Sequence, residues 1–542
     1  MASSSGLLGV GRRPRRAARR LIWLLVGLAA SVGLGLAVLV IGWSGATLVE
    51  DTSALARVEV QPLGGSLLSA RAFGRDGKRI PLSVSDGRLT PRSLLSPGEE
   101  VTVVVVVRRP AWLAWALGQS RTERLKLRTP VAHLTQRWLT IARDAPVRLR
   151  FAEPVARLSY RTRGGRHVEP ADGRRLVSLG QQASSGTVDV ASAARRWERL
   201  GPPVRVTWFP VSSLPVVLVS PGLTRPISPR APIRLTFSRP LTEAIGATQP
   251  RFSSQVKGSW QVADNHTLVF KPSGFGFPFA SQLHLQLPRQ FSLSTGEASF
   301  TARAIEWKVN DASFLRLQQL LASAGYLPLS WKPAHKLLPR RLTAELNAAV
   351  NPPAGSFYWR YPNTPPELRR LWMPGKPNEI THGAVMMFED DHQLTVDGLV
   401  GPRVWHALLR DTIAGKRRTD GYSYVFVHRQ LPQLLTLWHN GNVVLTSPGN
   451  TGVPVAPTQL GTFPVFEHIP VGTMSGTNPD GTHYNDPGIR WISYFHGGEA
   501  LHAFNRRSFG TPQSLGCVEL PLASAATLWP YTPIGTLVTI ED

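Results

Sequence analysis

The chain has 542 residues, of which 42% are hydrophobic and 18% are charged. This length exceeds one ordinary core and predicts three or four modules of roughly 150 residues each, while the apolar content excludes a generally disordered chain. Lys and Arg total 61 against 35 Asp and Glu, and the net charge of +26 favours polyanions such as anionic lipid or anionic wall polymers. The basic residues beyond the N-terminus are scattered and form no zinc-finger or RNA-binding pattern, so nucleic acid is not an expected partner.

The first 43 residues predict a membrane anchor. Residues 1–20 form a basic tail, and the 23 residues 21–43 are uncharged and apolar, long enough to cross a ~30 Å hydrocarbon core. Trp23 and Trp43 occupy interfacial positions, and the arginines of the tail should stay cytoplasmic (Arg12, Arg13, Arg15, Arg16, Arg19 and Arg20). We therefore expect a single-pass protein of the cell membrane whose later residues are extracytoplasmic. The alternative is a cleaved signal peptide with a weak cleavage site at residues 44–46.

Short β-rich runs separated by Pro and Gly follow. Residues 101–107 and 232–237 are typical of strands, and residues 260–270 predict two strands joined by a turn. Residues 50–215 are expected to hold one or two β-rich modules, and residues 216–307 a further β-sandwich.

Four short motifs in the last of these modules resemble the immunoglobulin-like modules of bacterial surface proteins. They are Ser220-Pro221, the strand at 235–238, the tripeptide at 258–260 and the run at 268–272. We expect this module and the preceding ones to act as a spacer that lifts the C-terminal machinery away from the membrane.

The pattern becomes helical after Trp307. Residues 314–321 place apolar side chains at a spacing of three and four, with Asp311 expected to cap the helix and Gly325 to end it. A second helix is expected at 384–392.

A third helix is expected to open at Pro402, after a tight turn at 394–401. Residues 383–409 thereby resemble part of the three-helix peptidoglycan-binding domain. The resemblance implies that the whole domain spans residues 308–415. An insertion at about 330–382, rich in Pro, Arg and Trp, departs from that family and puts its wall-binding groove in doubt. The alternative is a plain helical bundle.

Residues 421–542 return to a β-rich pattern, including a predicted hairpin at 434–445 with an Asn-Gly turn. The polar stretch 472–488 is too long for a simple connector and is expected to be a loop that covers a site as a lid. The candidate substrate-binding residues around it are Met474, Tyr484 and Tyr494.

Cys517 is the only cysteine, so it forms no intramolecular disulfide and is either a packed small hydrophobe or a working thiol. A thiol with a pKa of ~8.5 needs a base or a positive partner to react at neutral pH. Fourteen residues separate His502 from Cys517, enough for a returning strand, and we expect His502 to depress the pKa of the thiol. Gly516 permits a close approach of substrate and is expected to aim the N–H groups of Gly516 and Cys517 at an oxyanion.

His502 and the run Ser514-Leu515-Gly516-Cys517 resemble the L,D-transpeptidase catalytic domain of the YkuD type, whose pattern is a His followed by Ser-His-Gly-Cys. Thr451-Gly452 and residues 457–463 extend the likeness, which implies a mainly-β catalytic domain over residues 421–542. Two positions depart from the pattern. Leu515 replaces the usual second His, and Glu519 stands where Arg or Asn is common. The second departure is expected to alter the recognition of a substrate carboxylate, and Glu519 is a further candidate substrate-binding residue.

The resemblance implies cell-wall chemistry. Cys517 would attack the carbonyl before the terminal D-alanine of a peptidoglycan stem peptide, with His502 as general base, and the thioester would pass to an amine of a second stem. Ser514 would shape the turn and orient His502. Two alternatives stay open: an L,D-carboxypeptidase that uses water as acceptor, and a catalytically silent wall-binding protein.

No cofactor is expected, because the thioester conserves the energy of the broken peptide bond. No metal is expected either. His483, His496 and His502 lack the spacing of a zinc site. Asp480 and Asp486 fall short of an EF-hand loop.

Overall fold

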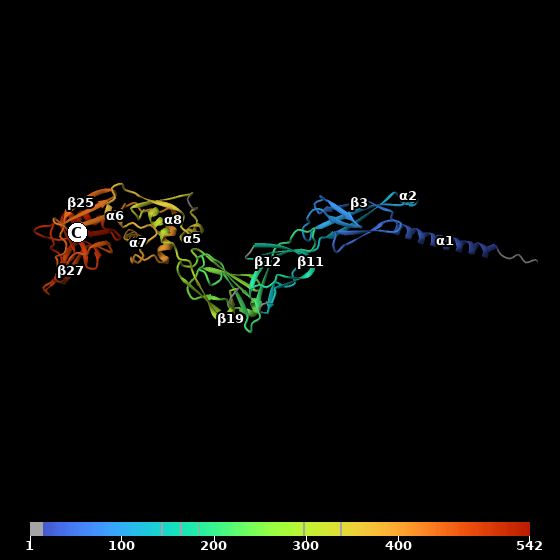
Figure 1. Ribbon diagram of the computed structural model, residues 1–542, viewed down its shortest axis with the longest axis horizontal. Helices are drawn as coiled ribbons and strands as arrows, with labels where there is room; N and C mark the ends of the chain where they lie inside the picture. Colours follow the sequence, from blue (N-terminus) through green and yellow to red (C-terminus); the bar gives the residue numbers. More distant parts are fainter. Residues whose placement is uncertain (1–14, 143–144, 163–164, 184, 296–298, 336–338) are drawn as a thin grey trace, which may run out of the picture. The chain divides into compact units, whose positions relative to one another are not determined.

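The computed structural model describes residues 15–142, 145–162, 165–183, 185–295, 299–335 and 339–542 (Figure 1). Arg12 and Arg13 of the basic tail lie outside these residues. The chain separates into two units, Met1–Leu218 with Ser292–Phe300 and Val219–Phe291 with Thr301–Asp542.

Helix α1 (Arg15–Trp43) confirms the expected N-terminal apolar helix. Its segment Leu21–Trp43 has 23 residues and a mean hydropathy of 2.6, so it is long and apolar enough to cross a membrane. Its side chains are exposed rather than packed into a core, as a segment that faces lipid requires.

Two β-modules fill the region 50–215. The first holds two four-stranded sheets: β1-β2-β6-β5 (Ala46–Val49, Ala56–Val60, Arg88–Pro91 and Leu82–Ser85) and β4-β3-β7-β8 (Arg79–Ile80, Ser66–Gly74, Glu100–Arg108 and Ser120–Arg128). Strand β7 confirms the strand expected at 101–107, and its alternate valines are buried. The short helix α2 (Ala111–Leu117), which the sequence reasoning missed, connects β7 to β8. The second module is a five-stranded sheet, β11-β10-β12-β13-β9 (Gly165–Ser178, Arg148–Thr162, Gly186–Ala193, Val204–Pro210 and Trp138–Ile141).

The strands of the third β-region join into one seven-stranded sheet. Its order is β16-β19-β14-β15-β18-β17, with β20 beside β19 (Arg251–Phe252, Gln282–Ser294, Val216–Ser220, Ile233–Phe237, Thr267–Pro272, Gly258–Asp264 and Ser299–Lys308), and the short helix α3 (Leu241–Ala244) follows β15. Strands β17 and β18 confirm the expected hairpin. The long β19 connects the strands, because it pairs with β16 near its start and with β14 near its end.

The helical region contains α4 (Phe314–Ala324), α5 (Leu342–Val350), α6 (Pro366–Arg370), α7 (Glu379–Asp391) and α8 (Pro402–Ala414). Gly325 ends α4 at a φ of +88°, and Pro402 opens α8, both as expected. The expected cap Asp311 is wrong: the N-cap residue is Ser313, and Asp311 pairs instead with Lys308 at 3.1 Å. Helix α7 begins earlier than expected because Asn378 caps it, accepting the backbone N–H of Thr381.

The insertion at 330–382 joins the helical region to the C-terminal domain. It holds α5, α6 and most of a two-stranded sheet, β21-β22 (Leu329–Pro333 and Gly355–Trp359). After β22, the Tyr361 hydroxyl donates to Asn440 Oδ1 at 2.5 Å, and Trp438 Nε1 donates to the carbonyl of Asn363 at 3.0 Å. Buried side chains of the helices and of the C-terminal domain form one hydrophobic cluster, which includes Phe388, Leu408, Tyr424, Trp438 and Leu537.

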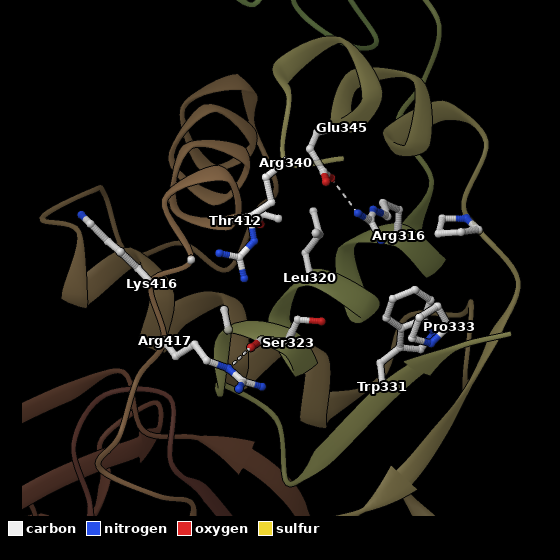
Figure 2. A pocket seen from close by; sticks show the side chains of 13 residues that line it. Arg316, Leu320, Ser323, Trp331, Pro333, Arg340, Glu345, Thr412, Lys416 and Arg417 are labelled. Atoms are coloured by element: carbon white, nitrogen blue, oxygen red, sulfur yellow. Dashed lines mark hydrogen bonds and ion pairs between the residues drawn. The ribbon is translucent and has the colours of Figure 1, made fainter. Parts of the chain in front are cut away.

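A pocket of about 310 Å³ lies in the helical region rather than beside Cys517 (Figure 2). Its wall includes a buried ion pair in which Arg316 donates to Glu345 at 2.6 Å, and both side chains are at least 95% buried. Figure 2 shows Arg340 directed toward this pocket and Lys416 directed away from it. Lys416 lies 3.5 Å from Asp411.

The C-terminal domain consists of two sheets and one short α-helix. One sheet is β25-β24-β23-β31-β26 (Asn442–Pro448, Leu434–His439, Ser423–His428, Leu537–Glu541 and Gly461–Pro464), and the other is β27-β28-β29-β30 (Glu467–Thr477, His483–His496, Glu499–Ala503 and Val518–Leu520). Buried side chains of both sheets and of α9 (Leu522–Leu528) share one core, and a 3-10 turn, η1 (Trp529–Tyr531), follows α9. The stretch 472–488 is not the expected loop, because residues 473–477 pair with residues 483–487 as the end of a β-hairpin.

We predict that Glu345→Gln destabilises the helical region by about 3 kcal/mol, because it leaves the Arg316 charge buried without its counter-ion. Hydrogen exchange of the α4 and α5 amides measures this local free energy. Glu367→Gln is the matched control, because Glu367 lies 4.0 Å from the exposed Arg370, and its removal should cost less than about 1 kcal/mol. Equal exchange rates in the two variants would contradict the prediction.

Candidate active site

The parallel pairing of β29 with β30 brings His502 near the turn that carries Cys517. His502 lies opposite Glu519 in this ladder, and Cys517 immediately precedes β30. Side chains two residues apart on a strand share a face, so Cys517 and Glu519 lie on the face of the sheet on which His502, the ladder partner of Glu519, also lies. The strand return expected from the sequence is therefore present.

His502 is held in one tautomer by its backbone. Its ring is buried, and Nδ1 lies 3.0 Å from the carbonyl oxygen of Ala503, which can only accept, so Nδ1 carries the proton. Nε2 is then left with a lone pair, as a general base requires. Burial lowers the pKa of His502, so the imidazole is neutral at neutral pH.

Cys517 is a half-buried thiol with an unfavourable environment for charge. Its Sγ lies 3.7 Å from the carbonyl oxygen of Gly498. Burial raises the pKa of the thiol to about 12, the backbone N–H of Ala500 lowers it, and the carboxylates of Glu519 and Glu499 raise it. The expected depression of the thiol pKa by His502 is therefore wrong for this structure, in which both partners are neutral.

Ser514 and Gly516 shape the turn that carries Cys517. The Ser514 hydroxyl donates to the carbonyl of Cys517 at 2.5 Å and accepts the N–H of Gly516 at 3.2 Å. Gly516 has a φ of +110°, which favours glycine, and a Cβ there would lie 3.2 Å from the side chain of Glu499. The N–H of Gly516 is thus occupied and does not face an oxyanion as expected. The N–H of Cys517 is then the remaining expected donor to an oxyanion, because no backbone hydrogen bond among the described residues gives it an acceptor.

Glu519 forms an ion pair with Arg506, a residue that was not identified from the sequence. Both of its carboxylate oxygens accept from Arg506, at 2.7 and 2.6 Å, and Glu519 itself is buried. The Arg506 guanidinium also donates to the carbonyl of Gln513 at 3.2 Å and lies over the Phe504 ring at 4.6 Å. Glu519 is a candidate substrate-binding residue, and in this structure a bidentate pair engages both of its carboxylate oxygens. An acidic residue in place of the family's Arg or Asn was the available signal for a compensating cation.

Met474, Tyr484 and Tyr494 lie around the thiol. Met474, Tyr494 and Cys517 pack against the same small cluster of buried residues, which includes Ile492. Burial raises the pKa of both tyrosine hydroxyls, and the nearby Cys517 raises it further. The β27–β28 hairpin thus forms one wall of the site, although as paired strands rather than as a loop.

Buried amides hold the loop that faces the cysteine turn. Gln433 donates to the Thr451 hydroxyl at 2.7 Å and accepts the Thr451 N–H at 2.8 Å. Asn450 accepts the N–H of Gly510 at 2.9 Å and pairs through its backbone with Glu519. Neither Gln433 nor Asn450 was identified from the sequence, because only the fold reveals that they are buried.

The histidines considered as metal ligands each have a different partner. His496 pairs with Glu499 at 3.4 Å, and His483 lies 3.1 Å from the Thr477 hydroxyl. Across the part of the chain that the structure describes, no group of three metal-ligating side chains occurs.

Comparison with known proteins identifies the C-terminal domain. Residues 422–540 match the family model of the YkuD L,D-transpeptidase catalytic domain. This model covers none of the preceding modules, whose immunoglobulin-like and peptidoglycan-binding resemblances stay predictions. No curated protein sequence matches the chain.

Solved structures of L,D-transpeptidases are also similar to this chain. An enzyme from Mycobacterium smegmatis is 13% identical, with 60% of this chain and 99% of that chain covered and a TM-score of 0.21. L,D-transpeptidase 3 from Mycobacterium tuberculosis, in complex with a faropenem-derived adduct, is 13% identical over 60% of this chain and 97% of its own, with a TM-score of 0.21. The catalytic domain from E. faecium is 24% identical over 23% of this chain and 100% of its own, with a TM-score of 0.21. The assignment of the domain rests on the family model.

We predict that Glu519→Gln makes the thiol more acidic, because it removes a carboxylate near Cys517 and leaves the Arg506 cation. At a fixed pH below the midpoint, alkylation by iodoacetamide should accelerate by up to about tenfold, which corresponds to about one pKa unit. The chain has a single cysteine, so the profile of rate against pH reports on Cys517 alone. Glu541→Gln, in the same domain but paired with Arg370, is the matched control and should leave the profile unchanged. A midpoint that moves to higher pH in Glu519→Gln would refute the charge argument.

Proposed function

We propose that this chain, whose residues 422–540 form a YkuD-type L,D-transpeptidase catalytic domain, cross-links peptidoglycan stem peptides through a thioester on Cys517. The tautomer of His502 beside the cysteine turn is the observation that carries the proposal, because it leaves Nε2 free to accept a proton. A YkuD domain acts on the cell wall, which supports an extracytoplasmic location.

The reaction begins from a neutral pair. As the sulfur attacks the carbonyl before the terminal D-alanine, the thiol proton passes to Nε2 of His502, so no thiolate accumulates beforehand. The buried site favours this order, since a free thiolate near Glu519 and Glu499 is costly. The developing oxyanion is stabilised by the N–H of Cys517, and His502 returns the proton to the departing amine.

The thioester is then consumed by a second stem peptide. A neutral side-chain amine attacks it and loses a proton to His502. The C–S bond breaks, and His502 returns this proton to the departing sulfur, which restores the neutral thiol. Water in place of the amine would make the protein a carboxypeptidase, with the same residues in the same roles. We favour the transferase because the matched family model is that of a transpeptidase domain.

Helix α1 supports a role as a single-pass membrane anchor. Its length and hydropathy suit a bilayer, and an export signal is consistent with the same features. We favour retention, because the first β-module bonds directly to the end of α1, where Arg121 donates to the carbonyl of Ile41 at 2.7 Å. The β-modules then act as spacers, and the net charge of +26 suits anionic wall polymers.

We predict that the full chain in detergent converts a disaccharide tetrapeptide to a cross-linked dimer with loss of D-alanine, as measured by mass spectrometry. Cys517→Ser and His502→Gln should each lower the rate by at least about a thousandfold, because an alkoxide, or a thiolate without its base, is far harder to form. His439→Gln, a half-buried histidine of the same domain, is the matched control.

The products distinguish the candidate functions. Tripeptide without dimer identifies the carboxypeptidase, and no turnover by a folded chain identifies the wall-binding protein. A carbapenem should also acylate Cys517. Undiminished turnover in Cys517→Ser would contradict the nucleophile assignment.

We also predict that Tyr484→Ala raises the KM for the tetrapeptide about three- to tenfold with little change in kcat, because this ring borders the thiol on the β27–β28 hairpin. Tyr358→Ala, at an exposed tyrosine of the helical region, is the control and should leave both constants unchanged. Steady-state rates at varied substrate concentration measure the split. A lower kcat at unchanged KM would place Tyr484 outside the binding surface.

A further inference from the structure

Helix α2 presents two tryptophan side chains to solvent. Trp112 is 60% exposed and Trp115 is 85% exposed, and their i, i+3 spacing places them on one face, whereas Leu113 is buried. Tryptophan is usually highly buried in a soluble domain, so two uncovered rings on one turn mark an interaction surface. Figure 1 shows α2 at the end of the first β-module from which α1 leaves.

Side-chain contacts tie α2 to the C-terminal end of α1. The guanidinium of Arg109 donates both to the Ser44 hydroxyl, at 3.3 Å, and to the carbonyl of Leu117 at the end of α2. Arg121, shortly after α2, donates to the carbonyl of Ile41 at 2.7 Å. The end of α2 therefore lies within one side-chain length of the point where the apolar run of α1 stops.

The chemistry of the segment matches the water–lipid interface. Helix α2 has the sequence AWLAWAL, without a charged residue. The strands on either side of it carry the exposed Arg108 and Arg124. Tryptophan rings concentrate at the headgroup level, and nearby arginines attract anionic lipid. A bilayer that contains Leu21–Trp43 has its outer surface at the level of Trp43.

We propose that α2 inserts Trp112 and Trp115 into the headgroup region of the outer leaflet and gives the first β-module a second contact with the membrane. This inference rests on the proposed anchoring by α1. Arg109 and Arg121 fix α2 against α1, so the insertion sets the orientation of the module relative to the bilayer surface.

The single cysteine permits a direct test in the full chain. Trp115→Cys in a Cys517→Ser background is labelled with the fluorophore NBD and reconstituted into vesicles of phosphatidylcholine and phosphatidylglycerol. Lipids that carry a spin label near the headgroup should quench about half of the emission, because an interfacial helix lies ~5–10 Å deep. The matched control is Val84→Cys in the same background. Val84 is exposed on β5, which lies at the opposite edge of its sheet from β1.

Flotation of the vesicles separates the two proposals. Quenching at position 115 and not at position 84, in chain that floats, supports insertion of α2. Chain that floats without quenching at position 115 overturns insertion and leaves the anchor intact. A blue-shifted emission without quenching also overturns insertion, because it would place a protein partner over position 115. Equal quenching at both positions also overturns the proposal, since it indicates unspecific adsorption. Chain that does not float overturns the proposed anchor as well.

Discussion

The backbone ladder between β29 and β30 is the constraint on which the catalytic site depends. It sets His502 opposite Glu519 and places Cys517 directly before the first residue of β30. Strands bonded in this way lie about 4.8 Å apart, so the relative positions of His502 and the turn that carries Cys517 follow from the sheet rather than from flexible side chains. The hydroxyl of Ser514 completes the arrangement by closing the turn that presents the cysteine.

Charge balance around the thiol follows from that arrangement. The ladder brings the Glu519 carboxylate near both the Cys517 thiol and the His502 imidazole, and its bidentate pair with Arg506 offsets that charge. Glu499, the second nearby carboxylate, accepts the N–H of Gln459 and pairs with His496. Burial has the largest effect on both groups: it raises the pKa of Cys517 and lowers the pKa of His502. Both side chains are therefore neutral at neutral pH. The raised pKa keeps Cys517 in its thiol form, which oxidises less readily than a thiolate.

The helical region and the catalytic domain share a core, which gives the insertion a structural role. Close approach requires glycine at two positions: a Cβ on Gly383 of α7 would lie 2.4 Å from the carbonyl of Gly535, and one on Gly535 would lie 2.3 Å from that of Gly383. Two hydrogen bonds add to this contact: the Tyr361 hydroxyl donates to Asn440, and the Trp438 indole N–H donates to the carbonyl of Asn363. The helical region is thereby a support for the catalytic sheet.

The sequence by itself determined the apolar run of α1, the order of β-rich and helical regions, the Gly325 and Pro402 helix ends, and the strand return between His502 and Cys517. Each of these follows from local periodicity, from a residue's own backbone preference, or from a short motif. Only the tertiary structure decided that residues 473–487 pair as a hairpin, that Arg506 neutralises Glu519, and that the Cys517 thiol has a raised pKa. Strand pairing, ion pairing and burial depend on which distant segments lie together, and a pattern of neighbouring residues does not contain that information.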